Sequence, residues 1–166
     1  MLDFRFVYMN KDDIDAILPS LFKILYFNMQ KVAPSDACYE EGYIIWSDYI
    51  RSEIQDDLTE TILIYHNDDL VGYFRYSIDT KSRSLLMADV QFVPEYQGKG
   101  LFNLLFKYVV GRLPKDILTV EAYANKTNHK SFAILEHLGL RCVGENKNGI
   151  SFHYIGDFSL IYNKYI

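Results

Sequence analysis

Cysteine is scarce in this chain of 166 residues. Cys38 and Cys142 are the only two, they stand far apart in the sequence, and neither belongs to a CxxC motif. A structural zinc site or a disulfide framework needs several closely spaced cysteine or histidine residues. The sequence therefore indicates neither, and no metal is expected.

Long basic runs and long apolar runs are also missing. Lysine and arginine nowhere form a cluster longer than a pair, and the formal net charge is −5, so a nucleic-acid or anionic membrane partner is not expected. The N-terminal residues 1–5 alternate charged and apolar side chains, and no apolar stretch is long enough to span a bilayer. We therefore expect a cytoplasmic protein with no membrane partner.

The composition is that of a globular protein. Hydrophobic residues make up 49% and charged residues 23% of the chain, a balance that favours a soluble fold over a disordered chain. The length corresponds to one domain, here expected to cover residues 1–166. Aromatic residues make up 16% of the chain, which suggests a cleft lined by aromatic side chains as well as a core.

Hydrophobic periodicity predicts an α/β fold with a mixed sheet, because helical and alternating segments are interleaved along the chain. The expected strands are Phe4 to Met9, Thr61 to Tyr65, Leu70 to Ile78, Ser84 to Val93, Ile117 to Tyr123, Leu140 to Glu145 and Ser151 to Tyr165. The expected helices run from Ile14 to a break at Pro34, from Ala37 to Ile54, from Leu101 to Leu113 and from Asn128 to Leu138. This order predicts a central, mostly antiparallel sheet with helices on both faces.

The segment from Pro94 to Gly100 is the most informative part of the sequence. A strand leads into a glycine-rich turn, and a helix begins directly after it. The first turn of a helix has unpaired N–H groups and the positive end of the helix dipole, so it attracts anions. Gly98 and Gly100 allow a close approach of the backbone. The segment therefore predicts a site for a pyrophosphate group.

Two other known types of phosphate-binding loop match this sequence poorly. A Walker loop needs Lys and then Ser or Thr after its last glycine, where this chain has Leu101-Phe102. A dinucleotide-binding loop needs a third glycine where Asn103 stands, and it belongs near the start of a parallel unit.

The segment resembles motif A of the GCN5-related N-acetyltransferases, which is written Gln/Arg-x-x-Gly-x-Gly/Ala. Gln97 and Gly100 match this pattern, and Pro94-x-Tyr96 precedes them in the form common in the family. A second resemblance follows in Asn128-x-x-Ser131 and Leu135-Glu136-His137-Leu138-Gly139-Leu140, which is similar to the family's Asn-x-x-Ala-x-x-x-Tyr-Glu-Lys-x-Gly-Phe. The resemblance implies a single N-acetyltransferase domain with an acyl-CoA N-acyltransferase fold.

The same resemblance implies acetyl-CoA as cosubstrate and a small-molecule or peptide amine as acceptor. Two positions depart from the family pattern: Phe102 replaces Gly or Ala, and Leu135 replaces the Tyr that protonates the leaving thiolate. The residues expected to bind the cofactor are Phe92, Val93, Gln97, Gly98, Lys99, Gly100, Leu101, Phe102, Asn128 and Ser131. Backbone N–H groups of Phe92 and Val93 are expected to hold the thioester oxygen. Asn128 has the alternative role of a helix N-cap.

A general base must take a proton from the acceptor ammonium, because only the neutral amine attacks the thioester. Asp89 and Glu121 are the candidates, since each lies near a strand end where chemistry is expected; the alternative is that each simply faces solvent. Tyr123 or water could replace the missing Tyr as proton donor, and the alternative for Tyr123 is core packing.

Four aromatic residues of the second predicted helix, Tyr39, Tyr43, Trp46 and Tyr49, are candidates for the acceptor cleft or for helix packing. Two other classes of function stay open. One is an acyl-CoA-binding protein without catalysis, and the other is an unrelated α/β protein that binds a phosphate ligand. Family members are often dimers, and pairing through an exposed C-terminal strand, Phe152 to Tyr165, predicts a homodimer.

Overall fold

Seven strands form one sheet in the computed structural model, which describes residues 3–55 and 58–166. The strand order is β1-β2-β3-β4-β5-β7-β6. The strands are β1 (Phe4–Tyr8), β2 (Thr59–His66), β3 (Asp69–Asp79), β4 (Ser84–Phe92), β5 (Thr119–Asn125), β6 (Arg141–Glu145) and β7 (Ser151–Asp157). The helices are η1 (Lys11–Asp13), α1 (Ile14–Val32), α2 (Tyr39–Ile54), η2 (Pro94–Tyr96), α3 (Leu101–Val110), α4 (His129–Leu138) and α5 (Phe158–Tyr165). The expected mixed α/β fold class is confirmed.

The strand directions follow from the connections. The pairs β1–β2, β5–β7 and β6–β7 are antiparallel. Strands β4 and β5 are joined through α3 and pair in parallel. Their pairing extends from Ser84↔Thr119 to Met87↔Ala122. Beyond that point β4 continues to Phe92 and leads into the glycine-rich turn.

The chain divides into two compact units. The first contains the described residues up to Arg75 together with Asp89–Lys99; the second contains Tyr76–Ala88 and Gly100–Ile166. Each unit carries one of the two cysteines, Cys38 in the first and Cys142 in the second, and both are exposed. A single domain over residues 1–166 stays a prediction, and residues 1, 2, 56 and 57 of that range lie outside the described residues.

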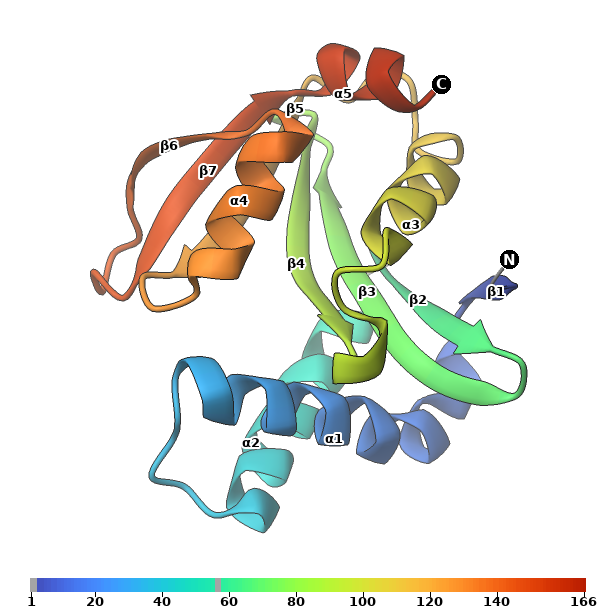
Figure 1. Ribbon diagram of the computed structural model, residues 1–166, viewed down its shortest axis with the longest axis vertical. Coiled ribbons are helices and arrows are strands. Elements are labelled where there is room, and N and C mark those ends of the chain that lie inside the picture. The colour runs from blue at the N-terminus through green and yellow to red at the C-terminus, as the bar shows by residue number, and fades with distance from the viewer. Residues whose placement is uncertain (1–2, 56–57) are drawn as a thin grey trace. The chain divides into compact units, whose positions relative to one another are not determined.

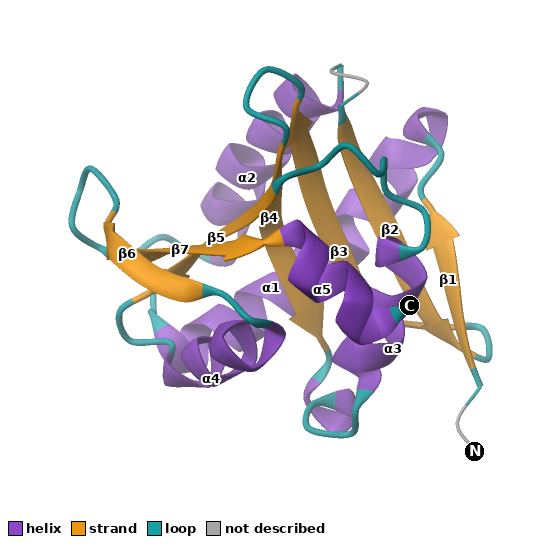
Figure 2. Ribbon diagram, turned by 90° about the horizontal axis from the view of Figure 1, so that it is seen from above, coloured by secondary structure: helices purple, strands orange, loops and turns teal. Residues whose placement is uncertain are grey.

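Helices α1 and α2 form the core of the first unit with the strands they cover (Figures 1 and 2). Leu18 and Leu21 are three residues apart, so both face inward from α1. They pack with Ile50 of α2, Leu63 of β2 and Tyr73 of β3, all buried. Burying one such side chain contributes about 1.5–3 kcal/mol to the free energy of folding. Together these side chains hold both helices against the sheet.

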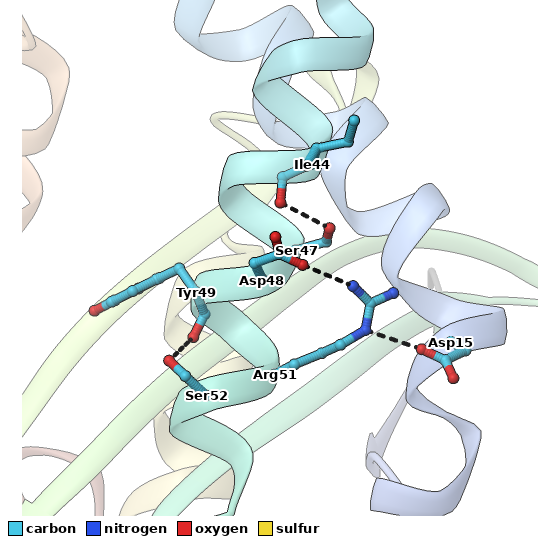
Figure 3. A network of polar contacts seen from close by, with 7 residues as sticks. All are labelled: Asp15, Ile44, Ser47, Asp48, Tyr49, Arg51 and Ser52. Atoms are coloured by element: carbon cyan, nitrogen blue, oxygen red, sulfur yellow. Dashed lines mark hydrogen bonds and ion pairs between the residues drawn. The ribbon is translucent and has the colours of Figure 1, made fainter.

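A polar contact at the surface adds to this helix pair (Figure 3). Arg51 of α2 lies 3.0 Å from Asp15 of α1 and 3.5 Å from Asp48 of its own helix. The Arg51 side chain is 41% exposed and that of Asp15 80%. Exposed ion pairs contribute between zero and about 1 kcal/mol. The contact therefore adds little to the stability of the helix pair, which depends mainly on the buried side chains.

The second unit contains α3, α4 and α5 with strands β5, β6 and β7. Helix α3 buries Leu105, Phe106 and Val109 and lies beside α5 (Figure 2). The ring of Phe132 in α4 contacts those of Phe152 and Tyr154 in β7, with centroids 5.5 and 6.1 Å apart. None of the described helices is both long and apolar enough to cross a bilayer.

The prediction for the C-terminus is wrong. Instead of one strand from Ser151 to Tyr165, β7 ends at Asp157 and α5 follows. Asp157 caps this helix by accepting a 2.8 Å hydrogen bond from the Ser159 amide, and Phe158 and Ile161 are buried at helical spacing. The sheet order also places β7 between β5 and β6, so β7 is not an edge strand. The expected edge pairing through residues 152–165 fails with it, and a homodimer stays a prediction.

The remaining predicted elements are present, with boundaries shifted by at most three residues. The largest shift is at the end of α3, which stops at Val110 instead of Leu113. Residues 111–113 continue as a turn, in which the amides of Arg112 and Leu113 donate to carbonyls three residues back.

Candidate functional site

The glycine-rich turn has the backbone conformation that the sequence predicts. After β4, η2 covers Pro94–Tyr96, and Gly100 stands at the N-cap of α3. Gly98 has φ +72° and Gly100 has φ +79°, values that other residues rarely adopt. A Cβ built at either glycine meets no atom within 4 Å. Backbone angle, and not crowding within the protein, is therefore what requires glycine at both positions.

Gln97 does not extend freely from this turn. Its Nε2 donates to the carbonyl oxygen of Phe92 at 2.9 Å and to Oδ1 of Asn28 at 3.4 Å. Both hydrogens of the Gln97 amide are thus directed at the protein, so the residue anchors the turn to the end of β4. The Nε2 of Gln97 is therefore not available to donate to a ligand.

Asn28, in the last part of α1, is a site residue that the sequence analysis missed. Its Nδ2 donates to the Phe92 carbonyl at 2.8 Å and to Gln91 Oε1 at 3.0 Å. These partners are more than sixty positions away in the sequence. No local pattern in the helix marks this asparagine, because its role depends on how α1 packs on the strand.

Asp89 lies at the inner end of the same set of contacts. Its Oδ1 accepts a hydrogen bond of 2.8 Å from Gln91 Nε2, and its Oδ2 accepts one of 2.5 Å from the Tyr73 hydroxyl. Burial raises the pKa of Asp89, while these two donors and the charge of Arg75 oppose the increase. Burial and the adjacent carboxylate also raise the pKa of Tyr73 well above its ordinary value. The Tyr73 hydroxyl is therefore a permanent donor to Asp89.

Val93 is unavailable for the role expected of its amide. The Val93 N–H donates to the carbonyl of Val71 in β3 at 2.8 Å. This amide is thus paired within the sheet and cannot also hold a thioester oxygen. Of the two amides expected to do so, that of Phe92 remains the candidate.

In the second unit, β5 and β7 bring Glu121 and Tyr123 together around His153. Tyr123 is directly opposite His153 in the strand register. The two rings stack with centroids 4.5 Å apart and an interplanar angle of 9°. His153 Nε2 lies 3.6 Å from Glu121 Oε1 and is buried without a hydrogen-bond partner among the described residues. His153 was not predicted from the sequence, because only the register reveals its neighbours.

Tyr123 does not fill the core. It is 48% exposed, because Thr119, Glu121 and Tyr123 alternate with the buried Val120, Ala122 and Ala124 along β5. The core-packing alternative for Tyr123 is wrong, and its hydroxyl is on the accessible face of the strand.

Helix α4 carries the second predicted motif. Asn128 is its N-cap, with Oδ1 accepting from the Ser131 amide at 3.4 Å. Leu135 is only 6% exposed and belongs to the core. The N-cap role of Asn128 is therefore real. A proton donor at position 135 is excluded by both the chemistry and the burial of leucine.

The predicted acceptor-side aromatics divide into two groups. Phe22 of α1 is surrounded by the rings of Tyr39, Tyr43 and Trp46, with centroids 5.1, 5.5 and 5.4 Å from its own. Tyr49 is 55% exposed, and its hydroxyl donates to Glu53 at 2.6 Å. Three of the four therefore pack between the helices, and Tyr49 faces outward.

Comparison with known families decides the assignment. The family model described as "Acetyltransferase (GNAT) family" matches residues 21–140, which is more than half of the chain. The chain belongs to the GNAT family. The match spans Asn28, the glycine-rich turn and the Asn128 motif.

Solved structures share the GNAT fold at low sequence identity. PaiA N-acetyltransferase from Thermoplasma acidophilum in complex with coenzyme A superposes with a TM-score of 0.74 at 13% identity, covering 94% of this chain and 99% of that one. An acetyltransferase from Thermus thermophilus gives 0.73 at 15% identity, with coverage of 94% and 97%. Spermidine N-acetyltransferase from Vibrio cholerae in complex with coenzyme A and spermine gives 0.68 at 14% identity, with 95% and 97%. No curated protein sequence matches the chain.

Phe102 stands where the GNAT motif has Gly or Ala, and its ring packs against its own helix. Its ring stacks on Phe106 one helical turn further along α3, with centroids 5.4 Å apart and an interplanar angle of 19°. The bulky residue thus packs along the helix that carries it. The departure from Gly or Ala at this GNAT position is absorbed by an aromatic pair within α3.

Proposed function

We propose that this GNAT protein transfers an acetyl group from acetyl-CoA to a primary amine of a small molecule or peptide. The observation that carries the proposal is the turn at Gly98 and Gly100. Two left-handed glycines lead directly into α3, whose first amides have no helical partner. That arrangement fits a pyrophosphate, which coenzyme A contains, and the superposable GNAT structures include two with coenzyme A bound.

The residues proposed to hold the cofactor act mainly through their backbone. The amides of Gly98, Lys99, Gly100 and Leu101 would bind the pyrophosphate, helped by the dipole of α3. The Phe92 amide would donate to the thioester oxygen, and Asn128 and Ser131 would lie along the pantetheine arm. Acetyl transfer then forms a C–N bond at the acceptor nitrogen and breaks the C–S bond of the thioester. The acceptor ammonium gives one proton to the general base before attack, and its nitrogen gives up a second proton as the amide forms. Coenzyme A leaves as the thiolate and becomes the thiol when it takes up one proton.

Glu121 is the better candidate for the general base. Both oxygens of Asp89 already accept hydrogen bonds from the side chains of Tyr73 and Gln91, whereas the Glu121 side chain is 31% exposed and lies 3.6 Å from His153. A water molecule can therefore reach Glu121 more readily and relay the proton. Tyr123, exposed on the same face two residues further along β5, is the candidate donor to the leaving thiolate.

Replacement of the two carboxylates separates these roles. We expect Glu121→Gln to lower kcat/KM by about 10²–10⁴-fold, the usual contribution of a positioned base. Asp89→Asn should act mainly on stability and cofactor affinity. Steady-state kinetics from pH 5 to 9 measure both. If Asp89 were the base, activity would fall as the pH falls through the raised pKa of Asp89. This decrease in activity at low pH would then persist in Glu121→Gln and would be absent from Asp89→Asn.

Thermal unfolding with candidate ligands tests the proposed function itself. A ligand at one hundred times its Kd stabilises the native state by about 2.7 kcal/mol, which corresponds to an increase in Tm of about 5–10 °C for a chain of this size. We expect this increase with acetyl-CoA and coenzyme A and none with NAD or ATP. Release of thiol in the presence of polyamines, amino acid amides and peptides then identifies the acceptor class. A Tm increase with NAD or ATP alone would contradict the proposal.

Acyl-CoA binding without catalysis is the second candidate function. The buried Leu135 favours it, because that position supplies the thiolate's proton in the family resemblance and leucine cannot. The two candidates differ in turnover. Tight binding of coenzyme A with no acetylation of any amine in the panel would support the binding role.

A further inference from the structure

The carbonyl of Phe92 is held by two side-chain amides at once. Asn28 Nδ2 donates to it at 2.8 Å and Gln97 Nε2 at 2.9 Å. Gln97 also donates to Asn28 Oδ1 at 3.4 Å. The three groups form a closed ring that joins α1, the last residue of β4 and the glycine-rich turn. We call this set the amide ring.

The amide ring continues to a partly buried carboxylate, that of Asp89. Asn28 donates to Gln91 Oε1 at 3.0 Å, and Gln91 Nε2 donates to Asp89 Oδ1 at 2.8 Å. Each donor in this chain points toward Asp89, which also accepts from Tyr73. The negative charge therefore fixes which way the Gln91 amide faces, and Gln91 in turn fixes Asn28.

Asparagine is the residue that this position requires. Its nitrogen supplies one hydrogen to Phe92 and one to Gln91, and its oxygen accepts from Gln97. Alanine would leave the Gln91 oxygen without this donor and the Phe92 carbonyl with only Gln97. Aspartate, of nearly the same shape, would present oxygen where both acceptors need N–H. A buried acceptor that loses its partner carries a desolvation penalty.

We propose that Asn28 is a positioning residue that locks the glycine-rich turn to α1 and thereby sets cofactor affinity. It touches no reacting atom. It fixes Gln97, the first residue of the turn, so that the amides that follow keep their direction. The part concerning the cofactor rests on the proposed function, whereas the part concerning the turn does not.

Amide hydrogen exchange and coenzyme A binding test this role together. We expect Asn28→Ala to speed exchange at the Tyr96 and Gln97 amides of the ligand-free protein by about tenfold or more, because these two amides donate to Val93 and Pro94 within the turn. We also expect it to weaken coenzyme A binding, measured by calorimetry, about tenfold. At saturating acetyl-CoA, kcat should change little. Lys23→Ala is the matched control, since Lys23 is exposed on the same helix. It should leave both measurements unchanged.

Asn28→Asp provides a pH signature that a merely structural role would not show. When ionised, the introduced carboxyl cannot donate to Phe92 or Gln91, so exchange at the turn should be fast at neutral pH. As the pH falls and the carboxyl is protonated, it regains one donor, and protection should recover in part. Asn28→Ala has no titrating group and should show no such recovery beyond that of the wild type.

The outcomes separate the two proposals. If wild-type protein binds no coenzyme A, the proposed function fails, and hydrogen exchange at the Tyr96 and Gln97 amides still decides the role of Asn28. If the wild type binds coenzyme A but Asn28→Ala matches Lys23→Ala in exchange and affinity, the positioning role is wrong. The same conclusion follows if Asn28→Asp shows unchanged exchange at neutral pH.

Discussion

Gly100→Trp is expected to lose the increase in Tm that acetyl-CoA and coenzyme A produce in the wild type. Gly100 has φ +79°, and a Cβ there meets no protein atom within 4 Å. A side chain can therefore leave the backbone at this position without an immediate clash, and an indole there stands next to the first amides of α3. A pyrophosphate could no longer approach those amides. The measurement is thermal unfolding with and without each ligand.

Gly149→Trp is the matched control for this prediction. Gly149 has φ +72° and lies in the turn between β6 and β7. Both substitutions place a side chain in the left-handed region, at a cost of roughly 1–2 kcal/mol. Both should lower the ligand-free Tm, and only Gly100→Trp should abolish the response to coenzyme A. If coenzyme A raised the Tm of both variants by the same amount, its binding site would not be at the amides next to Gly100.

Gly72→Ala is expected to destabilise the protein by about 2–3 kcal/mol, a large value for one methyl group. A Cβ at Gly72 of β3 would lie 2.6 Å from the carbonyl oxygen of Gln91 and 2.8 Å from the Phe92 ring. The first of these is backbone and cannot rotate away, so β3 and β4 must separate. Urea unfolding of the wild type and the variant measures the difference in free energy.

Gly111→Ala shows what the same change does without a clash. Gly111 has φ −66° at the end of α3, and its Cβ would meet nothing nearer than 3.6 Å. We expect it to be neutral or to stabilise by up to about 1 kcal/mol, because alanine restricts the unfolded chain. If Gly72→Ala behaves like Gly111→Ala, the close approach at Gly72 is not needed for the fold. If Gly72→Ala is folded, its amide ring should be loosened, since Gln91 and Phe92 must move.

The strand, turn and helix around Gly98 were predictable because their signals are local. Pro94 ends the strand, the two glycines permit left-handed angles, and an apolar periodic segment follows. Each of these residues determines the backbone conformation only of its near neighbours in the sequence. The same holds for the alternation of helices and strands, from which the mixed fold class followed.

The C-terminal segment shows where local pattern is ambiguous. Residues 151–165 are rich in aromatic and β-branched side chains, which favour a strand. The signal for a helix was present in Asp157 and Ser159, a residue pair that caps, and in the spacing of Phe158 and Ile161. A long apolar segment can hold both patterns in succession, and packing decides where one replaces the other.

The polar residues of the site could be predicted only in part. Gln97 matches motif A, and Asp89 and Glu121 lie near predicted strand ends, so the sequence singles out all three. Asn28 and His153 gain their importance from partners on distant segments, through helix packing in one case and strand register in the other. Side-chain amides and imidazoles occur throughout surfaces, so nothing in their immediate neighbours distinguishes these two.

The division of the chain into two units has a practical consequence for spectroscopy. Each unit holds one exposed thiol, Cys38 or Cys142, and the sequence contains no other cysteine. A maleimide dye pair therefore attaches with one fluorophore on each unit and no substitution. Energy transfer between the dyes, recorded while acetyl-CoA is titrated, reports directly whether the units change their separation when ligand binds.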